Sequence, residues 1–581
     1  MEQGIRAYAM GWQNWLGILA TGLLFVGGVV QAEGLSKNLA KNLATLPVAE
    51  ARGGTVLITP QNTLALLPGN RRLARVVFPR SDIPVVVPVL GPRLNQPGHQ
   101  LLRRLYAAGK AAGNDGDIYE NRDRAHSRLP PEAHPQLTHV AYGDSFQARN
   151  LDYGGAVQML FDAPLIGNSS TALAAGPLWR SLPRLMLTIN GKTGFRPGPQ
   201  NLYQNYAAGQ IHVYPEHRDH DDELGDLLPA NTPYYLISKG SSGSDQPHLQ
   251  ALAMILAALR PDTKAFLRQA DLIAPTVQMI YRRARVGVRS GAAYLSGAAH
   301  PSVFDARDID LVRMVGLANA IPPDAVPPMV RLRVTEDMKA REGVDYFGQG
   351  LSEVLFDTPS AIARVWRSRA GQRRMVVSAE ATRDPNGRKL SFNWVLLRGD
   401  PARVTLTPLT PDGARVQIDL IWQAPRAAPG TPDVISSRID IGVFANNGVY
   451  DSAPAFISVL LPRHETRRYE TGPDGQLRVA SIDWGPRDGV YADPLIFSEI
   501  PWRDDYHYDA AGQITGWTRI RPENGPKNGP DQVSTPDDYD ANGWRILARD
   551  TQGIPMRTAP VRYLADQKTN RPTRLREELL E

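Results

Sequence analysis

The stretch that decides the fold is PYYLISKGSSGSDQPHLQALAMILAAL, residues 233–259. It begins with an apolar run that predicts a strand, continues through a loop with two glycines, and ends with apolar residues at helical spacing. A serine or aspartate at 244–245 can cap this helix, and Pro247 suits its first turn. A strand that passes through a short glycine loop into a helix is typical of α/β proteins. We therefore expect a large mixed α/β (α+β) domain over residues 55–357 and place the functional site in it.

The loop of that unit, residues 238–245, predicts an anion site. Backbone N–H groups and the start of a helix can hold a phosphate, a sulfate or a uronate carboxylate. The loop lacks the P-loop pattern, and it ends in serine where a serine-hydrolase elbow needs glycine. A plain structural turn is therefore the other interpretation. The candidate ligand-binding residues are Lys239, Gly240, Ser241, Ser242, Gly243 and Ser244.

Just upstream, IHVYPEHRDHDD at residues 211–222 holds three of the chain's 11 histidines among four carboxylates. His212 lies on a predicted strand that Pro215 ends, and His217 and His220 follow in a loop that could fold back toward it. These three histidines are the candidate metal ligands, for Zn²⁺, Mn²⁺ or Ca²⁺. The order H-x-x-x-E-H is one residue longer than a helical zinc motif. Acid–base chemistry without a metal, and a polar loop held by salt bridges, are therefore alternatives.

A second polar run, YENRDRAHS at residues 119–127, supplies further carboxylates. Glycan hydrolysis uses two carboxyl groups whose pKa values differ. Glu120 or Asp123 could form such a pair with Glu216 or Asp219. A network of solvated salt bridges would account for the same residues. The candidate catalytic residues are His212, Glu216, His217, Asp219, Glu120 and Asp123.

The first 32 residues have the pattern of a signal peptide. Arg6 precedes an apolar core, Trp15 to Val30, and small residues at Val30 and Ala32 suit cleavage. The core is shorter than the roughly 20 residues of a membrane span, although an uncleaved anchor is the alternative. We expect an exported bacterial protein of the periplasm, cell surface or medium. Residues 33–54 then form a leader, and the mature chain has no membrane span.

Composition excludes several classes of function. Cysteine is absent, which removes disulfides, thiol nucleophiles and thiolate metal sites. The 65 basic and 59 acidic residues are interspersed, and no basic stripe with interleaved aromatic residues is present, so nucleic acid is not the expected partner. A polysaccharide or another extracellular polymer is the partner that export favours. Composition does not define the oligomeric state.

Residues 372–462 alternate short strands with turns, which is typical of a β-sandwich. DPNG at 384–387 leads into Leu390-x-Phe392-x-Trp394, with the tryptophan placed as a buried core aromatic. This segment resembles the PKD branch of the immunoglobulin-like domains. The usual glycine–aspartate–glycine of that family is replaced by RGD at 398–400. The resemblance implies a spacer or a module that contacts glycans or proteins, rather than a catalytic domain.

Residues 463–581 form a β-rich, turn-rich tail. Tyr506–Gly512 and Asp538–Gly543 resemble the tyrosine–aspartate (YD) repeats of large bacterial surface proteins, although two unrelated hairpins would give the same pattern. The region 117–347 resembles a module of exported proteins of environmental bacteria that has no known activity. That resemblance implies export and a multidomain context.

The sequence thus predicts a multidomain protein: a mixed α/β domain, an all-β immunoglobulin/PKD-like sandwich and a small β-rich C-terminal region. The expected function is an enzyme that acts on extracellular polysaccharide or another polymer, with acid–base or metal-assisted chemistry around residues 212–221. Two alternatives are a non-catalytic protein that binds carbohydrate or protein, and a structural component of the cell envelope.

Overall fold

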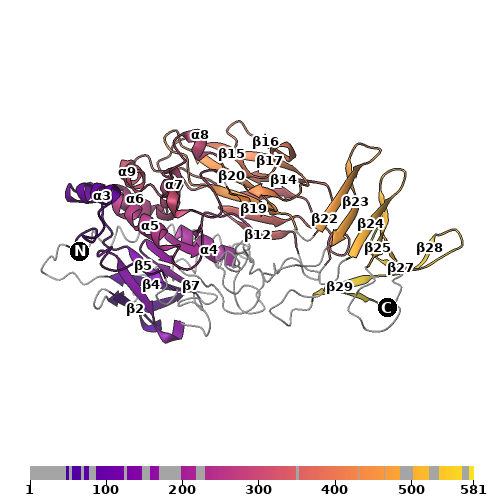
Figure 1. Cartoon of the computed structure of the whole chain (residues 1–581), viewed down its shortest axis with the longest axis horizontal. Coiled ribbons are helices and arrows are strands. Elements are labelled where there is room, and N and C mark those ends of the chain that lie inside the picture. Colours follow the sequence, from indigo (N-terminus) through magenta and orange to yellow (C-terminus); the bar gives the residue numbers. More distant parts are fainter. Residues whose placement is uncertain are drawn as a thin grey trace, which may run out of the picture.

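Three parts follow one another along the long axis of the molecule in this computed structural model (Figure 1): a helical and sheet-containing part, two central sheets and a set of hairpins. The several sheets and the helices confirm a mixed α/β organisation. The residues that the structure describes are 48–50, 55–66, 71–77, 87–122, 127–146, 158–168, 198–216, 229–347, 352–428, 431–462, 465–484, 502–521, 536–565 and 575–580. The expected signal peptide, residues 1–32, lies outside them. Within these ranges, no helix combines the length and the apolar character that crossing a membrane requires.

A six-stranded sheet with all neighbours parallel forms the frame of the first part. Its strands, in spatial order, are β10 (Tyr235–Ser238), β9 (Gln210–Pro215), β8 (Leu165–Asn168), β5 (Ile118–Asn121), β6 (Thr138–Tyr142) and β2 (Thr55–Ile58). A parallel sheet is normally covered on both faces, so its strands are apolar on both sides. The burial of every residue of β8, β9 and β10 fits this rule.

Helix α5 (Gln246–Ala258) is the centre of the helical layer and confirms the helix expected after the glycine loop. Every residue from Ala251 to Leu259 is at most 2% exposed. A helix that is apolar on all sides belongs inside a protein. Helix α5 accordingly packs on β8 and on three helices: α3 (Pro97–Ala107), α7 (Ile273–Arg283) and α9 (Leu311–Ala320). The remaining described α-helices are α4 (Gly198–Ala207), α6 (Pro261–Gln269) and the short α8 (Gly291–Tyr294).

A smaller sheet adds a second core to this part. Strand β4 (Arg71–Val77) pairs with β1 (Val48–Glu50), β3 (Thr63–Leu66) and β7 (Gln158–Phe161). Ala74, Met159 and Phe161 of the small sheet share a core with Val56 and Ile118 of the parallel sheet. Strand β1 falls inside the expected leader, residues 33–54, so the end of that segment is part of the folded domain.

Two sheets share one core in the central part. The first contains β11 (Arg333–Asp337), β14 (Gln372–Ser378), β17 (Arg415–Ile421) and β16 (Val404–Pro408). The second contains β12 (Val354–Thr358), β13 (Ala361–Val365), β21 (Ala455–Leu460), β20 (Arg438–Asn446) and β15 (Ser391–Arg398). Val377 and Ile418 of the first sheet pack with Ile441 and Ile457 of the second.

This pair of sheets differs from the sequence expectation in two details. It includes β11, β12 and β13, and therefore begins at residue 333, earlier than the expected 372. Trp394 is only partly buried, and its Nε1–H donates to the carbonyl of Gly413. Trp366 is the fully buried tryptophan and packs edge-on against Trp422. The resemblance to PKD domains stays a prediction.

The C-terminal part is a seven-stranded antiparallel sheet followed by a separate two-stranded sheet. Its strands are β22 (Glu465–Thr471), β23 (Leu477–Trp484), β24 (Trp502–Tyr508), β25 (Ile514–Ile520), β26 (Asp537–Asp540), β27 (Arg545–Arg549) and β28 (Pro555–Ala559), then β29 (Val561–Ala565) and β30 (Leu575–Leu579). A further hairpin, β18 (Arg426–Ala428) and β19 (Thr431–Ser436), belongs to the central part. Each predicted tyrosine–aspartate motif forms the turn of its own hairpin in the large sheet. The two turns have the same hydrogen bond: the Gly512 N–H donates to the Asp509 carbonyl, and the Gly543 N–H donates to the Asp540 carbonyl.

Candidate active site

The carboxyl ends of the parallel strands bring two of the predicted catalytic residues together. Glu120 of β5, Gly167 of β8 and His212 of β9 are register partners across three adjacent strands. Parallel partners project to the same face of a sheet, so the side chains of Glu120 and His212 meet over Gly167. In open parallel sheets, ligands bind outside the carboxyl ends of the strands. This edge is therefore the place to look for chemistry.

Glu120 is fully buried and all its oxygen atoms have partners. Oε1 lies 2.5 Å from Nε2 of His212 and 2.9 Å from Nη2 of Arg122. Oε2 accepts a hydrogen bond from the hydroxyl of Tyr142, the last residue of β6. Burying a carboxylate is favourable only when its charge is paired and hydrogen-bonded, and these three side chains meet that condition.

Gly167 is the residue that allows this contact. A Cβ atom at that position would lie 2.7 Å from Cδ2 of His212 and 2.8 Å from Cγ of Glu120, closer than real Cβ contacts occur. A glycine within a strand often marks such a close approach. The ring edge with Cδ2 and Nε2 therefore faces Gly167, and Nδ1 of His212 faces away from Glu120.

The ionisation states follow from burial and charge. Burial alone would raise the pKa of Glu120, but the Arg122 guanidinium and the bonds from His212 and Tyr142 outweigh it and lower the pKa to about 2. Burial lowers the pKa of His212 below its usual 6.5, against the opposing effect of Glu120. At neutral pH, Glu120 is a carboxylate and His212 is neutral, with its proton on Nε2. The lone pair of His212 is then on Nδ1, for which the structure records no partner among the described residues.

A second hydrogen-bonded chain lies on the opposite face of the sheet. The Leu129 N–H donates to the hydroxyl of Tyr119, which donates to Oδ1 of Asn168 over 2.9 Å. The amide of Asn168 donates in turn to Oδ2 of Asp245 over 2.8 Å. Tyr119 lies within β5, Asn168 is the last residue of β8, and Asp245 immediately precedes α5. The chain therefore fixes the carboxyl edge of the sheet to the start of the central helix.

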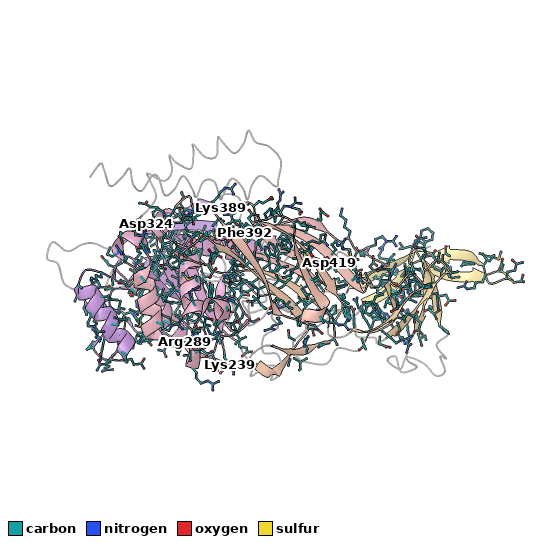
Figure 2. All side chains as sticks on the ribbon, turned by 90° about the horizontal axis from the view of Figure 1, so that it is seen from above. Lys239, Arg289, Asp324, Lys389, Phe392 and Asp419 are labelled. Carbon is teal, nitrogen blue, oxygen red and sulfur yellow. The ribbon has the colours of Figure 1, made fainter. Side chains whose placement is uncertain are left out.

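The glycine loop, residues 238–245, makes hydrogen bonds and an ion pair with other residues of the same chain. The φ angles of Gly240 and Gly243 are +118° and +96°, a region that favours glycine. The Gly243 N–H donates to Oγ of Ser127, and Ser244 shares a hydrogen bond with Ser238. Lys239 is at the surface (Figure 2), 3.5 Å from Asp305, and its side chain is 39% exposed. Ser241 and Ser242 are exposed. These contacts favour the structural-turn interpretation of the loop.

The other candidate residues have different outcomes. Glu216 follows β9, is buried, and its N–H donates to the Ser238 carbonyl at the end of β10. Asp123, His217, Asp219 and His220 lie outside the described residues, so their roles stay predictions. Within the described ranges, no three histidine or carboxylate side chains stand close enough to hold a metal ion. His212, the one described member of the predicted metal set, uses Nε2 for Glu120.

Three members of the site were not among the residues predicted from the sequence: Arg122, Tyr142 and Gly167. A glycine at the end of a buried strand is the signal that could have identified Gly167. Tyr142 ends an apolar strand two residues after Val140, the register partner of Glu120, so alternation puts it on the face of Glu120. This inference requires the strand order, which the sequence alone did not provide.

No family model and no curated protein matches the chain. Among solved structures, it is similar to a nucleoside hydrolase-related hypothetical protein from Saccharophagus degradans that is associated with carbohydrate metabolism. The sequence identity is 9%, the match covers 63% of this chain and 88% of that chain, and the TM-score is 0.20. At that TM-score, the likeness shows neither a shared fold nor a shared function.

Proposed function

We propose that this chain is an exported hydrolase of extracellular polysaccharide in which His212 is the general base and Glu120 orients it. The observation behind the proposal is the 2.5 Å contact between Nε2 of His212 and Oε1 of Glu120 at the carboxyl edge of the parallel sheet. A carboxylate that binds one ring nitrogen fixes the tautomer and leaves the other nitrogen as the proton acceptor.

In this mechanism, Nδ1 of His212 takes a proton from a water molecule as the water oxygen attacks the substrate. The imidazolium that forms is stabilised by the Glu120 carboxylate, and its proton is then available to the leaving group. Arg122 and Tyr142 keep Glu120 ionised throughout. Because the pKa of Glu120 is about 2, Glu120 does not act as the general acid of a two-carboxylate glycosidase.

The substrate class rests on the sequence. The signal-peptide pattern of residues 1–32 predicts export, and the PKD-like segment at 372–462 predicts a module beside the catalytic domain that contacts glycans or proteins. A large exported protein with acid–base chemistry and such a module suits a polymeric substrate outside the cell. Polysaccharide is therefore a better candidate substrate for this protein than a small metabolite.

A non-catalytic binding protein is the second candidate, and burial favours it. His212 is 4% exposed and Glu120 is fully buried. In that case, the pair stabilises the end of the sheet, and the substrate is bound without being cleaved. The two candidates differ in a measurable way, because only the first requires His212 for turnover.

The experiment is a screen of the purified mature protein against neutral and anionic polysaccharides, with release of reducing ends as the assay. Any hydrolysis found should fall about 10²–10⁴-fold in His212→Gln, the usual contribution of a general base. His248→Gln is the matched control, because His248 is also buried but binds the hydroxyl of Tyr281. Equal loss in both variants would contradict the assignment. Binding of a polysaccharide without hydrolysis would support the second candidate.

A further inference from the structure

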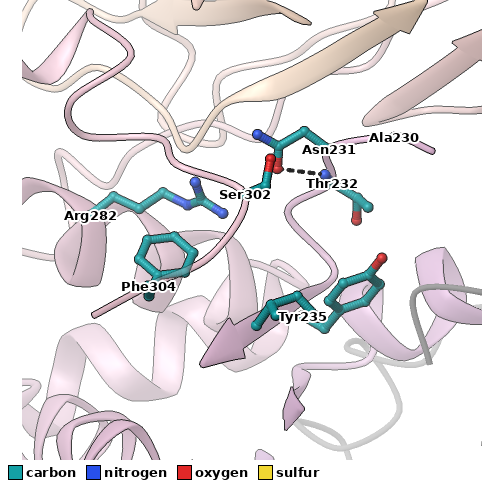
Figure 3. Close-up of a pocket in the computed structure, with 8 residues that line it drawn as sticks. Ala230, Asn231, Thr232, Tyr235, Arg282, Ser302 and Phe304 are labelled. Atoms are coloured by element: carbon teal, nitrogen blue, oxygen red, sulfur yellow. Dashed lines mark hydrogen bonds between the residues drawn. The ribbon is translucent and has the colours of Figure 1, made fainter. Parts of the chain in front are cut away.

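A small cavity lies in the α/β part, and it differs in position and chemistry from the Glu120 site. Figure 3 shows its main lining residues: Asn231, Thr232, Tyr235, Arg282, Ser302 and Phe304. Its volume is about 10 Å³, which is room for about one water-sized molecule. The guanidinium of Arg282 extends from α7 toward Ser302, above the ring of Phe304.

Arg282 is a buried cation that forms no salt bridge with a carboxylate in the part of the chain that the structure describes. It is 1% exposed, and its Nε–H donates to Oε1 of Gln278 over 3.0 Å. Nη1 is buried and has no hydrogen-bond partner among the described residues. The carbon of its guanidinium lies 4.9 Å from the ring centre of Phe304 and 5.4 Å from that of Phe456. Burial lowers the pKa of Arg282 to about 10, so the side chain is still charged at neutral pH.

The other large, fully buried arginines show what is missing. Arg364 pairs with Asp337 and Asp357, and Arg519 pairs with Asp504 through two hydrogen bonds. The ionisable side chains with the largest effect on the pKa of Arg282 are three tyrosines and Arg285. A buried charge without a counter-charge is strongly destabilising. The rings of Phe304 and Phe456 offset part of that cost through cation–π contacts. They do not supply a hydrogen-bond acceptor for Nη1.

Two hydroxyl groups of the cavity, those of Ser302 and Thr232, already accept hydrogen bonds from the protein. Oγ of Ser302 accepts a hydrogen bond from Arg438, and Oγ1 of Thr232 accepts one from the N–H of Tyr234. A hydroxyl that accepts in this way still has its own hydrogen to give. The cavity therefore combines one unpaired cation with two hydroxyl donors, which is the chemistry of an anion site.

We propose that this cavity binds a small inorganic anion of about the size of chloride, held by Arg282 and the hydroxyls of Ser302 and Thr232. The same segments contact the central sheets. The Asn231 N–H donates to Oγ of Ser458 on β21, and Ser302 accepts from Arg438 on β20. The bound anion thus stabilises the contact between the α/β part and the central sheets. This role is independent of any catalysis at His212.

Bromide is the probe, because its anomalous scattering distinguishes it from water. Crystals grown in sodium bromide should show an anomalous peak in the cavity, within hydrogen-bond distance of Nη1 of Arg282. A water molecule there, or bromide only at surface sites, would overturn the proposal. This measurement uses the wild-type protein and does not depend on whether a variant folds.

The solution test is thermal unfolding at constant ionic strength, with sodium bromide exchanged for sodium gluconate. Since an anion that binds only the folded state stabilises it, the Tm of the wild type should rise with bromide. Arg282→Met should lose this rise. Arg289→Met is the matched control, because Arg289 is 58% exposed and pairs with Asp310 at the surface; it should keep the rise. An equal response in all three proteins would overturn the proposal.

Discussion

Gly167→Ala is the perturbation that tests the geometry of the Glu120–His212 pair most sharply. The added Cβ would stand 2.7 Å from Cδ2 and 2.9 Å from Nε2 of His212, and 2.8 Å from Cγ of Glu120. All three atoms belong to buried side chains that are held by other contacts. Forcing extra volume into such a site costs about 1–3 kcal/mol. The reduced freedom of the unfolded chain returns about 0.4–1 kcal/mol, which leaves a net destabilisation of about 1–2 kcal/mol.

The assay is hydrogen exchange measured by mass spectrometry on peptides that cover β8 and β9. A protein of several domains does not give one unfolding free energy, whereas exchange reports the local opening of that part of the sheet. Gly316→Ala is the control, because Gly316 lies in α9 with open space around its Cβ position. That substitution should stabilise its helix by up to about 1 kcal/mol.

A double variant separates the steric cause from a general effect on the strand. Removing the ring in His212→Ala removes two of the three close contacts, so Gly167→Ala should cost less in that background, with a coupling of at least about 0.5 kcal/mol. If Gly167→Ala leaves exchange in β8 and β9 unchanged, or if the two substitutions are additive, the argument that Gly167 is required by the contact is wrong.

Four further predictions follow from the same contacts. Tyr142→Phe removes the hydroxyl that donates to Glu120 and should destabilise the sheet by about 1–3 kcal/mol; unchanged exchange in β5 and β6 would contradict this. Since the pKa of Glu120 is about 2 in the fold against an ordinary 4.5, its stabilisation is present above pH 4.5 and is lost as the pH falls toward 2. Glu120→Gln should therefore make the local opening free energy of β5, measured by hydrogen exchange, less dependent on pH between pH 5 and 2, and an unchanged pH dependence would contradict the pairing. Any hydrolytic activity should decline in acid with a midpoint below pH 6.5, because the pKa of His212 is lowered and a base must be neutral; a kcat/KM profile with a higher midpoint would exclude His212 as that base. Lys264→Met should leave the Asp117 carboxylate buried without its ion pair and cost about 3–5 kcal/mol, a loss that Asp117→Asn in the same chain should reduce.

The local parts of the fold were predictable from the sequence. The apolar strand, the glycine loop and the helix at 233–259 confirm the expected unit as β10 and α5. The strand expected at His212 matches β9. These elements depend on periodicity and on turn chemistry within a few residues, and both are visible in one sequence.

The pairing within the site was not predictable in the same way. Glu120 and His212 are 92 residues apart and meet because β8 lies between β5 and β9 in the sheet. The sequence interpretation paired Glu120 with a second carboxylate, since strand order cannot be read from spacing alone. It did select both residues, His212 because three histidines cluster among carboxylates at 212–220, and Glu120 because it belongs to the dense polar run at 119–127. The start of the central sheets at residue 333 was missed for a similar reason, since β11 to β13 are separated along the chain from the strands they join.

The central claim is that Glu120 holds His212 as a neutral base with its proton on Nε2. Protein labelled with ¹⁵N in its histidines tests this directly by NMR, with the His212 signals assigned through their loss in His212→Gln. The account predicts a neutral ring at pH 7, protonated on Nε2, which titrates below pH 6.5 and loses this tautomer preference in Glu120→Gln. A charged ring at pH 7, or a neutral ring protonated on Nδ1, would contradict it.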